Sequence, residues 1–143
     1  MPTQKEKNEK LVEILKNWQK LEDSSVQSTT DIIKKTDNPL VQIVMEIIRQ
    51  DSVMHRRVQQ LIIDHYEKQA LRLNIDELAE FWTKIEEHDE LEKKVIKLAK
   101  EAKEENNSAI VQYLLDYLLN DEEKHDNLLM EMDKIKNKMY PYG

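Results

Sequence analysis

Two segments of the chain carry an aspartate and a histidine four residues apart. Asp51 and His55 form one pair, and Asp121 and His125 form the other. Residues four apart on an α-helix lie one turn apart on the same face, and both pairs interrupt stripes of apolar residues. The chain has no cysteine, so any metal that it binds must be held by carboxylates and imidazoles. Each pair could instead be a hydrogen-bonded polar couple that fixes the register of its helix.

Two glutamates, Glu22 and Glu86, each follow a tryptophan by one helical turn. If the chain folds back near residues 37–38 and 105, Glu22 lies level with the 51–55 segment, and Glu86 lies within one turn (~5 Å) of His125. Each hairpin could therefore direct one carboxylate inward. An exposed glutamate at the edge of an apolar stripe is the commoner case.

Helical periodicity and capping residues predict four helices and no strand. Glycine occurs only at position 143, which removes the residue that the tight turns of a β-fold need. Thr3, Asn38 and Asn74 each precede an apolar stripe with helical spacing, and side chains of these types cap helix N-termini. The predicted helices span residues 4–36, 39–70, 75–105 and 108–139. We expect residues 1–143 to form a single all-α domain, an antiparallel four-helix bundle.

The second half of the sequence repeats features of the first. Segments 39–70 and 108–139 align at an offset of 70 residues, which superimposes the two Asp/His pairs. Segments 4–36 and 75–105 align at an offset of 64, which superimposes Glu22 on Glu86. The chain is therefore predicted to consist of one helical hairpin used twice.

Segment 108–139 also contains a Glu-x-x-His motif, because Glu122 precedes His125 by three residues. With the paired glutamates and histidines, this motif resembles the ferritin-like and rubrerythrin-like di-iron carboxylate proteins, in which two helices give one Glu each and two give Glu-x-x-His. The resemblance covers nearly the whole chain. Segment 39–70 departs from the family's pattern, because Ser52 stands where the glutamate should be and only Asp51 offers a carboxylate.

The resemblance implies a ferritin-like bundle that holds two iron or manganese ions, metals that oxygen and imidazole ligands suit. The ligands it implies are Glu22 and Glu86 as terminal or bridging carboxylates, His55 and His125 as terminal imidazoles, and Asp51 and Glu122 as the rest. Asp121 would contact one of these ligands rather than the metal itself. The expected reaction is an oxidation or the reduction of peroxide. Rubrerythrins carry a cysteine-held electron-transfer centre that this chain lacks, so redox activity would need an external electron donor.

Whether the protein is an enzyme is left open by these residues. A second hypothesis makes it a non-catalytic helical scaffold or interaction protein, in which the inward Asp/His pairs are structural and a leftover apolar stripe supports a homodimer. A third hypothesis places a small-molecule pocket between the helices at the level of the polar residues.

Charge and hydropathy bear on partners and location. Charged residues make up 36% of the chain and the formal net charge is −7, so we expect no nucleic-acid binding. No apolar run approaches the ~20 residues that span a bilayer, and the N-terminus lacks an apolar signal core. We therefore expect no membrane insertion and a cytoplasmic location.

Overall fold

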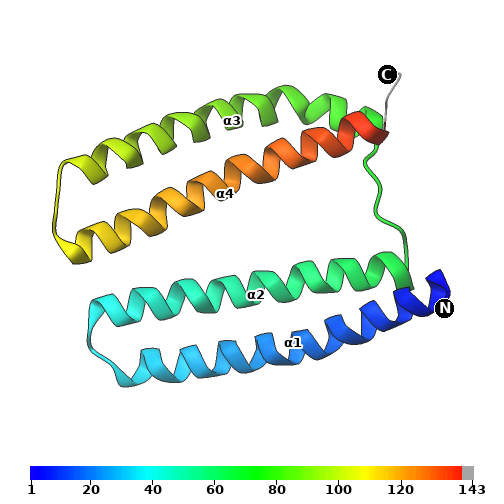
Figure 1. Ribbon diagram of the computed structural model, residues 1–143, viewed down its shortest axis with the longest axis horizontal. Helices are drawn as coiled ribbons and strands as arrows, with labels where there is room; N and C mark the ends of the chain where they lie inside the picture. Colours follow the sequence, from blue (N-terminus) through cyan, green and yellow to red (C-terminus); the bar gives the residue numbers. More distant parts are fainter. Residues whose placement is uncertain (140–143) are drawn as a thin grey trace. The chain divides into compact units, whose positions relative to one another are not determined.

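The computed structural model describes residues 1–139, without the side chains of Ile75 and Met139. Within that range it contains no strand and four α-helices (Figure 1), which are α1 Gln4–Lys35, α2 Pro39–Glu67, α3 Ile75–Glu104 and α4 Ala109–Met139. The predicted all-helical fold is confirmed. The largest difference from the predicted bounds is at the end of α2, which was expected at residue 70 and lies at Glu67. No helix of the described residues is both long enough and apolar enough to cross a membrane.

Capping side chains set the starts of three helices. The Thr3 hydroxyl accepts a hydrogen bond from the Glu6 N–H at 3.1 Å. Asn38 Oδ1 accepts the Leu40 N–H at 2.9 Å, directly after Pro39 has opened α2. Asn74 Oδ1 accepts two N–H groups at the start of α3, at 3.0 and 3.2 Å. Each such cap stabilises its helix by about 1 kcal/mol, which explains why the predicted starts are accurate.

The four helices form two helical hairpins. Helix α1 packs against α2, and α3 packs against α4. A short turn joins the two helices of each hairpin, which therefore run antiparallel (Figure 1). The chain divides into two compact units, one from Met1 to Arg72 and the other from Leu73 onward. The predicted pair of hairpins is confirmed, whereas their union in one four-helix-bundle domain stays a prediction.

The same side-chain contact closes both turns. In the first hairpin, Gln42 Nε2 donates to the Thr36 carbonyl oxygen at 2.8 Å. In the second, Gln112 Nε2 donates to the carbonyl oxygen of Lys103 at 2.8 Å and also to that of Asn106. Gln42 and Gln112 are 70 residues apart, as are Thr36 and Asn106. Equivalent positions of the two hairpins are therefore 70 residues apart, and we call this offset their shared register.

This register corrects the predicted alignment of α1 with α3. Glu22 and Glu92, 70 residues apart, are both buried, whereas Glu86 is exposed. The predicted offset of 64 is wrong because it followed Trp18 and Trp82, which are not equivalent positions. Six residues make about 1.7 helical turns, so Glu86 points about 120° away from Glu92 around the axis of α3.

Candidate metal centre

Three ligand-type side chains meet in the second hairpin. Glu92 comes from α3, and Glu122 and His125 come from α4. One ligand atom from each residue lies within 4.8 Å of the other two. His125 Nδ1 lies 3.5 Å from Glu92 Oε1 and 3.5 Å from Glu122 Oε2. Because Glu122 and His125 are three apart on one helix, both side chains face the same residue of α3.

Glu92 is the buried member of this cluster. Only 6% of its surface is exposed. Its Oε1 atom lies 2.8 Å from His88 Nε2, one helical turn earlier on α3. Its Oε2 atom is buried and has no hydrogen-bond donor among the described groups. A buried carboxylate oxygen without a donor is costly, so this atom needs either a proton nearby or a cation.

The two carboxyl groups of the cluster titrate as a pair. The pKa of Glu122 is raised, first because its carboxyl hydrogen-bonds with Glu92 and then because of its burial and the charge of Glu92. The pKa of Glu92 is lowered, first by that hydrogen bond and further by His88 and His125. A hydrogen bond between two carboxyl groups requires a proton on one of them, so the protonation of Glu122 depends on the charge of Glu92. The two carboxyl groups therefore titrate as a coupled pair, and a bound cation would favour the form in which both are ionised.

The second ring nitrogen of His125 faces another carboxylate. His125 Nε2 lies 3.3 Å from Asp121 Oδ2, while Nδ1 faces the two glutamates. Histidines that bind metals usually donate their other N–H to a carboxylate, which fixes the tautomer and orients the ring. The donor set of two carboxylates and one oriented imidazole fits iron or manganese.

The equivalent place in the first hairpin has fewer ligands. His55 Nδ1 lies 3.3 Å from Glu22 Oε2, which mirrors the contact of His125 with Glu92. The position equivalent to Glu122 is Ser52, which is buried and donates to the Ser25 hydroxyl at 2.8 Å. Two ligand-type side chains therefore meet here where the second hairpin has three.

Of the six predicted ligands, the structure brings together Glu22 with His55 and Glu122 with His125. Asp51 is exposed and is not an ion-pair partner of His55 in the described chain. Glu86 is exposed and lies outside the cluster. Its place is taken by Glu92, which the sequence interpretation missed. An offset of 70 for both helix pairs would have found it, because that offset aligns Glu22 with Glu92.

His88 was the other omission. It is not among the predicted ligands, because the offset of 64 aligns it with Ser24, yet its ring lies against Glu92 Oε1. Its side chain is 57% exposed, so it closes the cluster on the solvent side. Spacing offered a signal here too, because residues 88 and 92 are one helical turn apart.

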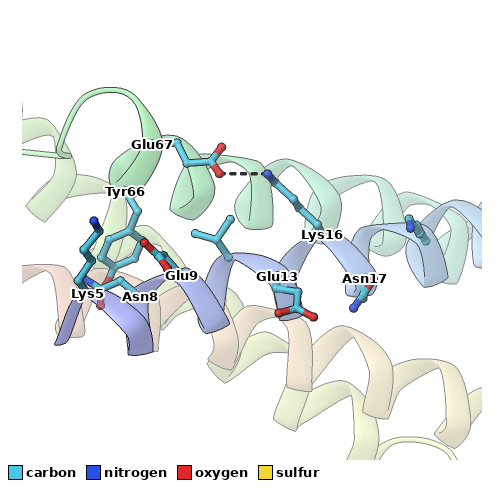
Figure 2. A pocket seen from close by; sticks show the side chains of 10 residues that line it. Lys5, Asn8, Glu9, Glu13, Lys16, Asn17, Tyr66 and Glu67 are labelled. Carbon is cyan, nitrogen blue, oxygen red and sulfur yellow. Dashed lines mark hydrogen bonds and ion pairs between the residues drawn. The ribbon is translucent and has the colours of Figure 1, made fainter. Parts of the chain in front are cut away.

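The first hairpin has a separate open groove of about 790 Å³ between the start of α1 and the end of α2. Figure 2 shows Lys16 reaching across it to Glu67, with 3.0 Å between Lys16 Nζ and Glu67 Oε1. Three lysines and three glutamates line the groove. This balance indicates no preference for a cation or an anion.

Comparison with protein-family models, with curated proteins and with solved structures finds no match for this chain.

Proposed function

We propose that this protein binds a divalent iron or manganese ion through Glu92, Glu122 and His125. The observation that carries the proposal is the buried Glu92 carboxylate, which faces a second carboxylate and an imidazole and has an oxygen without a hydrogen-bond donor. The pKa of Glu122 is raised beside Glu92, and a cation held between the two carboxylates would relieve their repulsion. Asp121 then serves to hold the His125 ring in its binding orientation.

A ferritin-like di-metal oxidoreductase is the extended form of this proposal. Glu22 and His55 offer one carboxylate and one imidazole of the types that the family uses. Bound iron or manganese would supply redox chemistry with oxygen or peroxide. The chain's own residues would bind and orient the ions, and electrons would come from an external donor because the chain has no cysteine. We place this activity in the cytoplasm.

A non-catalytic scaffold is the second candidate, and contacts in the first hairpin favour it. Ser52 donates to Ser25, and Arg56 Nε lies 2.8 Å from Asp23 Oδ1, so polar residues link α1 to α2 without metal. Exposed apolar residues such as Leu21 offer a surface for a homodimer. This candidate predicts a dimer by light scattering and no bound metal.

Anaerobic calorimetric titration with Fe²⁺ and Mn²⁺ tests the metal proposal. We expect saturable binding that weakens by about 100-fold or more in Glu122→Gln, because a charged ligand is lost while the side-chain shape is kept. Glu131→Gln is the matched control, since Glu131 is an exposed glutamate of α4 that pairs with Lys134, at 3.0 Å, and lies outside the cluster. Equal affinities in the two variants, or no saturable binding by the unmodified protein, would contradict the proposal.

A further inference from the structure

A second groove lies between α3 and α4, with a volume of about 470 Å³. Ten residues line it, and none of them is basic. Half of them are carboxylates, which are Glu86, Glu87, Asp89, Glu90 and Asp133. The three metal-centre residues are not among the lining residues. The groove is therefore a separate and strongly acidic feature of the second hairpin.

Apolar side chains accompany these carboxylates. Trp82 and Ile85 of α3 and Leu129 and Met130 of α4 line the same groove. A surface of this kind matches a molecule that is both cationic and aliphatic. A hydrated metal ion would gain nothing from the apolar side chains of the groove. Among the described residues, the candidate metal ligands are Glu92, Glu122 and His125, which lie outside the groove.

The chain already places an alkylammonium group at this groove. Lys136 Nζ lies 3.8 Å from the centre of the Trp82 ring and 3.3 Å from Asp133 Oδ1. An ammonium over an indole face and beside a carboxylate is the arrangement that recognises amines. Lys93 Nζ lies 3.5 Å from Asp89 Oδ2 and also pairs with Glu90, at 3.3 Å. Lys136 and Lys93 therefore form ion pairs with three of the five carboxylates.

The other two carboxylates, Glu86 and Glu87, have no ion-pair partner among the residues that the structure describes, and both are exposed. We propose that this groove binds a linear aliphatic polyamine, whose ammonium groups pair with Glu86 and Glu87 and whose methylene chain lies on the apolar residues. The volume falls within the range of about 300–1,000 Å³ typical of small-ligand sites, which favours a small amine over a protein segment. This inference is independent of the metal centre.

Titration of the full chain with spermidine tests the proposal. In a Trp18→Phe background, Trp82 is the single tryptophan, so its fluorescence reports on the groove. We expect a saturable change with one spermidine per chain. In a Glu86→Gln, Glu87→Gln double variant, the affinity falls about tenfold or more, because two charge-assisted contacts are lost.

A control double variant, Glu101→Gln with Glu104→Gln, removes the same charge from α3 outside the groove and should leave the affinity unchanged. Glu92→Gln should also retain spermidine binding, which separates this groove from the metal centre. Equal weakening in both double variants would overturn the proposal, because it would show only general attraction to an acidic surface. Tighter binding of a lysine-rich peptide with the charge of spermidine would overturn the assignment to a small amine.

Discussion

Glu92 and Glu122 carry opposite pKa changes although both are glutamates of the same cluster. The hydrogen bond between them is the main cause, because it raises the pKa of Glu122 and lowers that of Glu92, which the two histidines lower further. Two ionised carboxylates this close repel each other, so the pair keeps its last proton to a higher pH than an isolated glutamate would. Metal uptake should therefore release a proton, and affinity should increase as the pH rises through the raised pKa of Glu122.

The stability of the metal-free protein should follow the same carboxyl group. A raised folded-state pKa means that the contribution of Glu122 is fully present below its ordinary pKa of 4.5 and is lost as the pH rises through the raised value. In Glu122→Gln the amide can still donate to Glu92 and carries no charge. We expect its melting temperature at neutral pH to rise by about 2–4 °C in the metal-free protein, while its metal affinity falls.

Thermal unfolding followed by circular dichroism between pH 4 and 8 checks this, with Glu131→Gln as the control. The unmodified protein and the control should both lose stability through the raised pKa of Glu122, and Glu122→Gln should lose less. If all three proteins have parallel pH profiles, the carboxyl pair does not govern this stability.

Part of the candidate site could be predicted residue by residue. Glu122 and His125 belong to one local motif, and the observed cluster contains both. Glu92 could not be predicted from local spacing, because it meets them from a different helix and depends on the register of α3 against α4. Asp51 shares the spacing of Asp121 but not its contact, because Asp121 reaches His125 while Asp51 is exposed.

At the scale of elements, the two hairpins have diverged around one shared register. Glu122 of α4 corresponds to Ser52 of α2, and Val95 of α3 corresponds to Ser25 of α1. The Ser25–Ser52 hydrogen bond therefore fills the space in the first hairpin where the second hairpin has a ligand. The first hairpin should gain metal binding if this polar pair is replaced by the residues of the second.

The double substitution Ser25→Val, Ser52→Glu makes that exchange. The introduced glutamate would join Glu22 and His55, so we expect metal content to increase by about one ion per chain. Elemental mass analysis after anaerobic loading measures the gain. Adding His55→Ala should abolish the extra ion and leave the original one. An unchanged metal content in a folded double variant would show that the shared register does not define the site.

The helices could be predicted because their signals are local. Thr3, Asn38 and Asn74 cap helices where the sequence predicted starts, since a cap involves residues two or three positions apart. The alignment of the α1 sequence with the α3 sequence could not be predicted as reliably. Two tryptophans at an offset of 64 competed with Glu22 and Glu92 at an offset of 70, and only contacts between helices decide between the two alignments.

At the scale of the whole molecule, each hairpin taken by itself leaves apolar side chains exposed. Leu21 is 69% exposed and Leu91, 70 residues later, is 53% exposed. An apolar stripe predicts that a helix face will be buried, but it does not identify what buries it. For this reason the sequence predicts the two hairpins better than any assembly of them.

The metal proposal makes a prediction for the distribution of stability along the chain. Because the proposed ligands lie on α3 and α4, Mn²⁺ should slow amide hydrogen exchange there and leave α1 and α2 unchanged. At a free metal concentration of about 100 times the dissociation constant, the added stability is about 2.7 kcal/mol. Hydrogen exchange followed by mass spectrometry measures it. Equal protection of both hairpins would contradict a centre confined to the second one.

Metal content after anaerobic loading with ferrous iron is the most direct test of the central claim. We predict about one ion per chain in the unmodified protein, its loss in His125→Ala and its retention in His55→Ala. Two ions per chain, with losses in both variants, would support the extended di-metal form. A protein that retains its metal in His125→Ala, or binds none when unmodified, would contradict a metal centre at Glu92, Glu122 and His125.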